Sequence, residues 1–254
     1  MRTTKAIRAL RDLTDGNSNE LGFLVLSGSF NPIHSGHFQL LDAARATCIR
    51  EGVKIIAGFL APSSDDYVGA KLGGQAWPLD LRIRLCSLAA AASDWIDVWD
   101  SGQMSGFRLC REIFGQIRSD GADLLAGRSL TGIEVMGSDA AIRIFDKVAD
   151  DWEAEGAARP WYERRRVCCF LRPGVTGYDD AAHLESWTSP RVARVGIIIS
   201  IVDPRAEGFA LESVSGTKIR RIMARNDWSG LSAQNWLHPS VLEFLWTSCI
   251  QQDE

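Results

Sequence analysis

Residues 28–37 read Gly-Ser-Phe-Asn-Pro-Ile-His-Ser-Gly-His. The apolar run Phe23–Leu26 precedes them, and such a continuous run is typical of a buried strand in a parallel sheet. Apolar residues recur at helical spacing after them, from Phe38 to Cys48, and Ser35 is available as the helix cap. We therefore expect residues 28–37 to form a glycine-rich loop between a strand and a helix.

A loop of this kind has a clear use in an open α/β fold. It brings backbone N–H groups and the positive end of a helix dipole to the carboxyl edge of the sheet, where anionic ligands bind. His34 and His37 lie three residues apart at the start of the helix, so both imidazoles fall on one face. Taken singly, a glycine often serves a turn and a histidine the surface or core, but the combination favours a phosphate site.

The stretch resembles the N-terminal signature of the nucleotidylyltransferase superfamily. In that superfamily the core is a Rossmann-like sheet, and a His-x-Gly-His element contacts the phosphates of ATP. The Phe-Asn-Pro spelling at residues 30–32 is more similar to the nicotinamide-nucleotide adenylyltransferase branch than to the cytidylyltransferases, which tend to carry an acidic residue at the position of Asn31.

Length, charge and hydropathy bound the class of protein. The chain has 254 residues and a formal net charge of -4, and it contains no block of five or six basic residues; its densest basic run is Arg164–Arg166. Nucleic-acid binding is therefore not expected. We also find no apolar segment long enough to span a bilayer and no apolar signal core at the N-terminus. These features predict a soluble intracellular protein, either cytoplasmic or nuclear.

The cysteines point to the same compartment. They are scattered without Cys-x-x-Cys spacing, and most lie inside apolar runs, so they are expected to be buried thiols rather than disulfides or zinc ligands. The six are Cys48, Cys86, Cys110, Cys168, Cys169 and Cys249.

A second strand is predicted over residues 53–60, followed by a glycine-rich loop and a helix over residues 80–95. In eukaryote-type adenylyltransferases of the branch, a similar strand end is followed by an Asp, a Tyr, a lysine-bearing loop and a helix with an early arginine. The resemblance implies that Lys71 contacts a phosphate of the mononucleotide and that Arg82 is the early arginine. The loop is longer than in the family pattern, and the alternative for Lys71 is a solvent-exposed loop lysine.

Two tryptophans are candidates for contact with a pyridine ring. The stretch 95–99 alternates like a strand, and the resemblance implies that Trp99 stacks on the substrate; a half-buried core tryptophan is the alternative. Another predicted strand, over residues 167–171, ends at Arg172, which the resemblance places in a substrate-binding turn. Counting back from it favours Trp152 over Trp161 as the second aromatic residue.

Helices are predicted over residues 109–118 and 142–152, with a loop that extends from the first of them to residue 131 and a strand over residues 133–136. That strand ends in Gly137-Ser138-Asp139, which resembles the Gly-Ala-Asp of the family. A carboxylate at the carboxyl end of a strand can accept hydrogen bonds from ribose hydroxyls, so Asp139 is a candidate for the nucleotide sugar. A plain turn would use the same residue types.

The second strong motif follows a β-branched strand predicted over residues 195–202. Residues 213–221 read Ser-Val-Ser-Gly-Thr-Lys-Ile-Arg-Arg and resemble the Ile-Ser-Ser-Thr-x-Ile-Arg element of the family. A helix that opens with Ser and Thr hydroxyls, free N–H donors and arginines favours phosphate binding, although an ordinary capped surface helix has the same start. Gly216 replaces the second serine, which removes one hydroxyl contact.

We therefore predict a lead-in over residues 1–20 and a single domain over residues 21–254. The fold class is α/β: a Rossmann-like open parallel sheet with helices on both faces and C-terminal helices. The resemblance implies transfer of the adenylyl group of ATP to nicotinamide or nicotinate mononucleotide, giving NAD or deamido-NAD and pyrophosphate, with Mg²⁺ held through the ATP phosphates rather than by protein ligands.

The resemblance also implies roles for individual residues. His37, His34 and Arg220 are the expected catalytic residues. The expected ATP contacts are Gly28, Ser29, Phe30, His34, Gly36, His37, Gly137, Asp139, Ser215, Thr217 and Arg220. The expected mononucleotide contacts are Asn31, Lys71, Trp99, Trp152 and Arg172.

Two alternatives stay open at this stage. One is a sister transferase that acts on another phosphorylated acceptor, such as phosphopantetheine or a phosphoalcohol, although the tryptophans favour an aromatic acceptor. The other is a diverged protein that binds or slowly hydrolyses nucleotides. The preference between amide and acid mononucleotide and the oligomeric state are also open.

Overall fold

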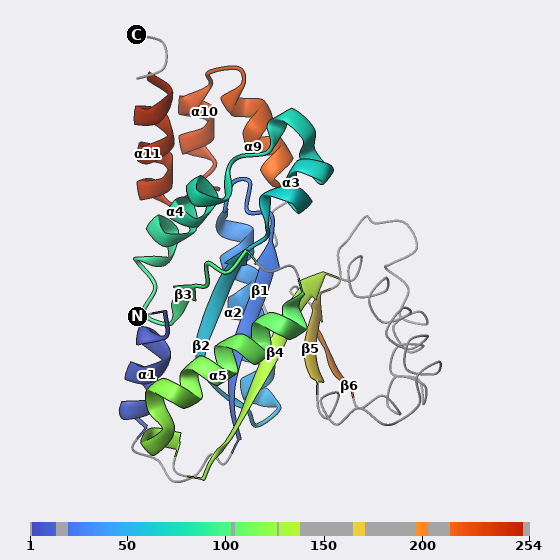
Figure 1. Ribbon diagram of the computed structural model, residues 1–254. Coiled ribbons are helices and arrows are strands. Elements are labelled where there is room, and N and C mark those ends of the chain that lie inside the picture. The colour runs from blue at the N-terminus through green and yellow to red at the C-terminus, as the bar shows by residue number, and fades with distance from the viewer. Residues whose placement is uncertain are drawn as a thin grey trace, which may run out of the picture.

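The computed structural model describes residues 2–13, 20–102, 105–125, 127–137, 165–170, 197–202 and 214–250. Six parallel strands form one sheet in the spatial order β3-β2-β1-β4-β5-β6 (Figure 1). The strands are β1 (Glu20–Gly28), β2 (Lys54–Pro62), β3 (Ile96–Val98), β4 (Ser129–Gly137), β5 (Arg165–Phe170) and β6 (Ile197–Val202). The predicted open parallel sheet is confirmed, and its strand order reverses between β1 and β4.

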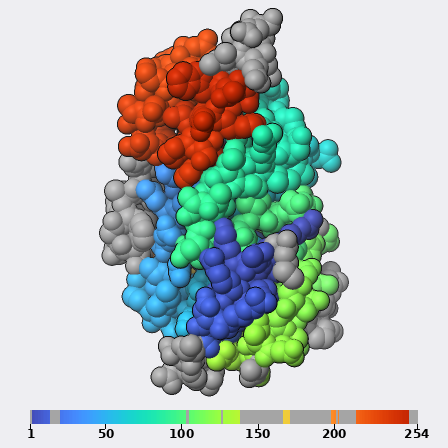
Figure 2. All heavy atoms as spheres, turned by 90° about the vertical axis from the view of Figure 1, so that its left-hand side faces the viewer, coloured from blue at the N-terminus to red at the C-terminus, as the bar shows by residue number. Residues whose placement is uncertain are grey.

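Helices cover both faces of the sheet, as predicted. One face packs against α1 (Thr4–Arg11) and α5 (Gly106–Leu125). The other packs against α2 (Ser35–Arg50) and α4 (Leu79–Ala90), and the core on this side extends to the C-terminal helices α9 (Gly216–Met223), α10 (Trp228–Ala233) and α11 (Pro239–Ile250), which lie beyond the ends of the strands (Figure 1). Figure 2 shows α11 packed beside α4 on one side of the molecule. Within the described part of the chain, no helix has the length and apolar character needed to cross a membrane.

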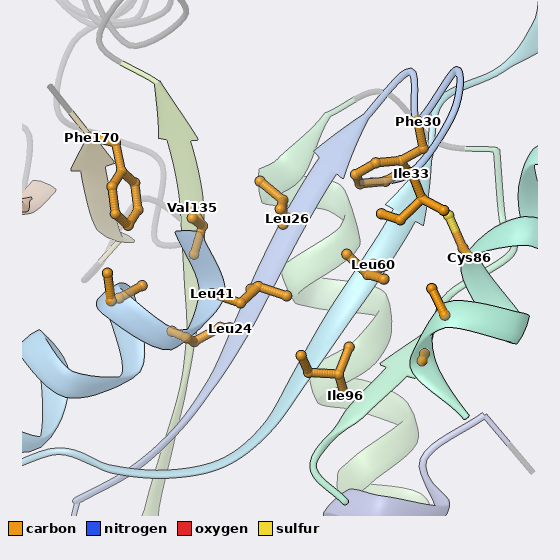
Figure 3. Packing of buried hydrophobic residues seen from close by; sticks show 14 of the residues in the cluster. Leu24, Leu26, Phe30, Ile33, Leu41, Leu60, Cys86, Ile96, Val135 and Phe170 are labelled. Atoms are coloured by element: carbon orange, nitrogen blue, oxygen red, sulfur yellow. The ribbon is translucent and has the colours of Figure 1, made fainter. Parts of the chain in front are cut away.

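The central strand β1 is buried on both sides, which explains why it reads as a continuous apolar run. Leu24 and Leu26 lie in the core on the α2 side, together with Leu41 and Val135 (Figure 3). Phe23 belongs to the opposite core, on the α5 side. Burial of each such side chain contributes roughly 1.5–3 kcal/mol, so β1 anchors both layers.

The N-terminal helix α1, which lies within the predicted lead-in, packs into this core. Ile7 and Leu10 are buried in the cluster that α5 and the sheet share. Lys5 reaches over the end of α4 and the start of β3: its Nζ donates to the carbonyl oxygens of Ala90 (2.9 Å) and Ile96 (2.5 Å). Residues 4–11 therefore tie the edge strand β3 to the body of the domain.

A helix occupies part of the stretch that the sequence predicted to be a loop. α3 runs over Asp65–Leu72 and is followed by a 3-10 turn, η1, over Gly73–Gln75. Ser64 caps α3 by accepting a hydrogen bond from the N–H of Tyr67 at 3.4 Å. Two aspartates in the first turn of α3 complement the helix dipole. The prediction of a glycine-rich loop through Gly74 between the second strand and the next helix therefore missed α3.

Other helix boundaries differ from the prediction for local reasons. α4 ends at Ala90 rather than near Trp95, because the Oγ of Ser93 accepts the N–H groups of Trp95 and Ile96 and so starts β3. α5 is longer than the predicted 109–118, and β4 begins at Ser129, within the predicted loop. The helix predicted over residues 142–152 lies outside the described residues.

Four cysteines lie in the core as free thiols, and Cys110 is partly exposed. The Sγ atoms of Cys48 in α2 and Cys168 in β5 are 3.5 Å apart, within hydrogen-bonding reach. That hydrogen bond is the main reason that the pKa of Cys48 is lowered, whereas burial raises the pKa of Cys86.

Replacing Lys5 with methionine should lower the free energy of unfolding by about 1–3 kcal/mol at pH 7, because buried carbonyls and the carboxylate of Asp97 lose their partner. The backbone N–H of Lys5 donates to Asp97 at 3.0 Å, and its Nζ lies 3.8 Å from the same carboxylate. Burial raises the pKa of Asp97 and Lys5 lowers it. Without the ammonium group, the folded-state pKa of Asp97 rises further above its unfolded value.

The loss of unfolding free energy in Lys5→Met should therefore shrink as the pH falls towards the raised pKa of Asp97, since the folded protein then binds a proton at Asp97. Urea unfolding at pH 7 and pH 4.5 measures both values. Arg11→Met on the exposed side of the same helix is the matched control and should change stability little. An equal loss for both variants at both pH values would contradict the role of Lys5.

Candidate active site

The loop between β1 and α2 is short and tightly held. Gly28 ends β1 and Ser35 begins α2. Between them Phe30 has a φ of 44°, in the left-handed region, a conformation that costs a residue with a side chain roughly 1–3 kcal/mol. The Phe30 ring is buried and lies edge-on to the ring of His37, with centroids 4.8 Å apart. Burial of the ring compensates for the strained backbone and places the loop beside α2.

The two histidines of the motif lie against each other. Their ring centroids are 3.7 Å apart and their planes are tilted by 31°. The backbone N–H of His34, the residue before α2, donates a hydrogen bond to Nδ1 of His37 at 3.1 Å. The first turn of the helix therefore holds both imidazoles on one side, at the positive end of the helix dipole.

A second helix N-terminus, that of α9, approaches the same loop. Ser215 caps α9, and its Oγ accepts the N–H of Lys218 at 3.3 Å. Ile219 is fully buried and anchors the helix in the α2-side core. The residue that departs from the family pattern, Gly216, faces the loop: a Cβ there would lie 2.8 Å from the carbonyl oxygen of Asn31. Glycine therefore permits a close approach of the two segments that a serine would obstruct.

Arg220 links α9 to the loop. Its Nη1 donates to the carbonyl oxygen of Asn31 (2.6 Å), its Nη2 to Oγ1 of Thr217 (3.3 Å) and its Nε to Oε1 of Gln75 (3.3 Å). Burial lowers the pKa of Arg220 from its ordinary value. A guanidinium group nevertheless stays charged at neutral pH, so it provides a positive charge beside both helix N-termini.

Asn31 braces the loop from the inside. Its Oδ1 accepts the N–H of Trp77 and its Nδ2 donates to the carbonyl of Gln75, both at 2.8 Å. The side chain is buried, and these two bonds use its amide group. In this structure the amide positions the loop, and the predicted contact of Asn31 with the mononucleotide stays a prediction.

Arg82 is a second brace, and its side chain is 0% exposed. Its Nε donates to the carbonyl of Trp77 (2.8 Å), its Nη1 to the carbonyl of Ser29 (3.0 Å) and its Nη2 to the carboxylate of Asp65 (2.8 Å). One guanidinium thus joins the glycine-rich loop, the start of α3 and the segment before α4.

These segments surround a cavity of about 680 Å³ at the carboxyl edge of the sheet, beside the point between β1 and β4 where the strand order reverses. Ligands of open α/β folds bind at such a point. The predicted site residues that line the cavity are Gly28, Ser29, Phe30, Asn31, His34, His37, Lys71, Gly137, Ser215, Thr217 and Arg220.

Two predicted residues lie elsewhere. Gly36 is buried behind the histidines, and a Cβ there would lie 2.9 Å from Cγ1 of Val214, so it serves packing. Trp99 is 4% exposed in the α5-side core, edge-on to Phe59, and its Nε1 donates to Glu112 at 3.3 Å. The structure does not bring Trp99 to the cavity, because its ring fills the space between the sheet and α5.

The remaining predictions lie outside the described residues. They are Asp139, Trp152 with its alternative Trp161, and Arg172. Their roles stay predictions.

Other residues line the cavity without having been predicted. Tyr67 and Leu72 come from α3, Leu40 from α2 and Glu134 from β4. Leu40 and Leu72 carried no signal, because ordinary helix residues look the same, whereas Tyr67 matches the tyrosine of the family order but was assigned no contact. Glu134 did carry one: a carboxylate inside the apolar run Ile133–Met136 is unusual for a buried strand.

Among the residues that the structure describes, no group of three or more His, Cys, Asp and Glu side chains is arranged to hold a metal ion. The polar groups at the histidine end of the cavity are imidazoles, hydroxyls and a guanidinium, beside the N-termini of α2 and α9. This set is suited to anions, whereas Mg²⁺ prefers oxygen ligands.

Comparison with protein families identifies the fold family. A model described as cytidylyltransferase-like matches residues 25–222 of the chain. The chain belongs to the cytidylyltransferase-like family. The matched range starts in β1 and ends in α9, so the cytidylyltransferase-like domain includes both helix N-termini that meet at the cavity.

Two known proteins are similar to part of the chain. A stretch of 107 residues is 30% identical to the nicotinamide/nicotinic acid mononucleotide adenylyltransferase of Oryza sativa subsp. japonica and covers 41% of each protein. A stretch of 90 residues is 37% identical to nicotinamide/nicotinic acid mononucleotide adenylyltransferase 2 of Xenopus tropicalis and covers 34% of this chain and 28% of that protein. The similarity thus spans less than half the length of these relatives.

A solved structure extends the likeness to nearly the whole fold. The nicotinic acid mononucleotide adenylyltransferase of Plasmodium falciparum, complexed with NaAD, superimposes with a TM-score of 0.52 over 90% of this chain and 96% of that one. The two sequences are 12% identical in this superposition, so the likeness concerns the cytidylyltransferase-like fold alone.

Proposed function

We propose that this protein transfers the adenylyl group of ATP to nicotinamide or nicotinate mononucleotide and releases pyrophosphate. The observation that carries the proposal is the convergence of two helix N-termini, two stacked imidazoles and one partly exposed guanidinium on a single cavity. Such a set of donors and positive charges fits a polyphosphate. The names of the relatives from Oryza sativa and Xenopus tropicalis support the choice of acceptor.

In the proposed reaction, an oxygen of the 5′-phosphate of the mononucleotide attacks the α-phosphorus of ATP. A bond forms between these two atoms, and the bond from the α-phosphorus to the oxygen that bridges to the β-phosphorus breaks. The electron pair leaves with pyrophosphate, and no covalent enzyme intermediate forms. Catalysis of this kind consists of holding two anions in line and stabilising the charge that develops on the leaving group.

The residues divide this work by their positions. His34 and His37, at the start of α2, face the phosphates at which the bond breaks. Ser215 and Thr217, at the start of α9, bind the distal phosphates, and Arg220 between the two helices neutralises charge on both. Asn31 and Arg82 act through the loop, since their hydrogen bonds hold it in place.

Mg²⁺ belongs to the proposal as an ion that enters with ATP. The donors at the histidine end suit anions rather than a cation, so phosphate oxygens of the nucleotide would hold the ion. When bound, it supplies positive charge that neutralises the leaving pyrophosphate.

Purified protein incubated with ATP, Mg²⁺ and each mononucleotide in turn tests the proposal directly. We expect stoichiometric formation of dinucleotide and pyrophosphate, detected by chromatography. Formation of only ADP and inorganic phosphate would instead identify a protein that hydrolyses nucleotides and would overturn the proposed synthesis.

Replacing Arg220 with methionine should raise the KM for ATP by about 10- to 100-fold, because a charge-assisted contact to a phosphate contributes roughly 1.5–3 kcal/mol. The KM for the mononucleotide should rise less. Steady-state kinetics with each substrate varied in turn measures both values.

Arg221→Met is the matched control, since Arg221 is the next residue of the same helix and is exposed. It should leave both KM values near those of the unmodified protein. Equal effects of the two substitutions would show that general charge, rather than the placement of Arg220, is responsible.

A further inference from the structure

Gln75 connects two walls of the cavity, although no sequence motif indicated it. It is the last residue of η1, the 3-10 turn that follows α3, and it is not among the described residues that line the cavity. Its backbone carbonyl accepts a hydrogen bond from Nδ2 of Asn31 at 2.8 Å, which fixes the turn to the glycine-rich loop. Its side-chain Oε1 accepts a hydrogen bond from Nε of Arg220 at 3.3 Å. Gln75 therefore joins η1 both to the loop and to the guanidinium that lines the cavity.

The hydrogen bonds of Arg220 leave one end of its guanidinium open. The group has five N–H donors, one on Nε and two on each Nη. Within the described part of the chain, Nε donates to Gln75, one donor of Nη1 is used by the carbonyl of Asn31, and one donor of Nη2 is used by Oγ1 of Thr217. The remaining donors are on Nη1 and Nη2. An anion that binds Arg220 from the cavity can therefore use the Nη1–Nη2 end, whereas Gln75 closes the Nε edge.

A guanidinium that is already held in place binds an anion more tightly than a mobile one. Arginine has a long side chain, and ordering such a side chain when a ligand binds costs conformational entropy. Arg220 is partly exposed, so burial alone does not fix its direction. Its three acceptors come from three segments, namely η1, the glycine-rich loop and the first turn of α9. Together they fix the plane of the group before a ligand arrives.

We propose that Gln75 is a positioning residue, which orients Arg220 toward the phosphates of ATP and thereby raises the affinity for ATP. This inference rests on the proposed function, in which Arg220 meets those phosphates. Gln75 acts through Arg220 and does not itself contact the nucleotide. A neutral amide is suited to this role, because its oxygen accepts the Nε hydrogen and leaves the positive charge available. A carboxylate at the same place would compete with the phosphates for the guanidinium.

Gln75→Met keeps the length of the side chain and removes the acceptor. It should raise the Kd for ATP by about threefold to tenfold, measured by titration calorimetry with Mg²⁺ and without mononucleotide. The KM for the mononucleotide and the urea midpoint should stay near those of the unmodified protein, which a merely structural role of Gln75 would not allow. In the Arg220→Met background the same substitution should change the Kd by less than about twofold, because its partner is absent. Gln234→Met, at the exposed end of α10, is the matched control and should leave the Kd unaltered.

The outcomes separate this inference from the proposed function. An unchanged or lower Kd for ATP in Gln75→Met would overturn the inference while adenylyl transfer stands. An equal loss of affinity in the Arg220→Met background would also overturn it, because Gln75 would then act by a route other than Arg220. Absence of dinucleotide from the unmodified protein would reject the proposed transfer, whereas a weaker affinity for ATP in Gln75→Met would still support the orientation of Arg220. Absence of ATP binding by the unmodified protein would reject both.

Discussion

Replacing His37 with alanine should lower kcat for adenylyl transfer by about 30- to 1000-fold, which corresponds to about 2–4 kcal/mol of barrier. The imidazole stands at the start of α2, stacked on His34 and edge-on to Phe30, so its position is fixed before substrate binds. A donor held in this way contributes most where charge develops on the leaving pyrophosphate. The KM for ATP should therefore change much less than kcat, which single-turnover and steady-state kinetics will separate.

His238→Ala is the matched control for this substitution. His238 lies just before α11, where its Nδ1 accepts the N–H of Ser240 at 3.3 Å, and it does not line the cavity. Its kcat should stay near that of the unmodified protein. Near-normal turnover of His37→Ala, with folding intact by circular dichroism, would remove His37 from the proposed mechanism.

Arg82→Met should lower the free energy of unfolding by about 3–5 kcal/mol, the loss typical for removing one partner of a buried ionic network. The guanidinium is fully buried and serves three partners, of which the carbonyls of Ser29 and Trp77 would lose their donor without gaining free access to water. Urea unfolding at pH 7 measures the loss, and the midpoint should fall while the slope is retained.

The other partner of the ion pair provides an asymmetric control. Asp65 is 60% exposed, so Asp65→Asn removes a charge that water already screens and should cost less than about 1 kcal/mol. Similar losses for both substitutions would show that the ion pair itself, rather than the buried hydrogen bonds to the loop, stabilises this region.

The parts of the fold that could be predicted are those with strong local signals. β1 and β2 are continuous apolar runs, and a strand buried on both faces produces such runs in any parallel sheet. The glycine-rich loop and the cap of α9 were also predictable, because Gly, Ser and Thr at these points satisfy backbone needs within a few residues. The positions of the two helices whose N-termini meet at the cavity follow from such local chemistry.

The missed helix α3 shows where local reasoning ends. Pro62 and three glycines, at positions 69, 73 and 74, all indicate turns, and a short segment of this composition is a poor helix on its own. The helix forms because Asp65 in its first turn pairs with Arg82 and because Val68 is buried. Tertiary contacts of this kind cannot be predicted from residues that are adjacent in the sequence.

Trp99 and Glu134 show the same limit at the site. Both occur in strands or at strand ends. Side chains alternate along a strand, so the sequence shows only that neighbouring side chains face opposite sides of the sheet. Which face meets the cavity depends on where α5 begins, and that is decided by packing. The aromatic residue therefore looked like a ligand contact and lies in the core, whereas the carboxylate looked like a strand interior and lines the cavity.

The hydrogen bond from the backbone of His34 to Nδ1 of His37 has a consequence for proton placement. A ring nitrogen that accepts a hydrogen bond carries no hydrogen, so the neutral imidazole is held in the tautomer with its hydrogen on Nε2. The helix start thereby chooses the tautomer before any substrate arrives. In the proposed reaction, His37 would then donate to a phosphate oxygen as a neutral ring, without first taking up a proton from solvent.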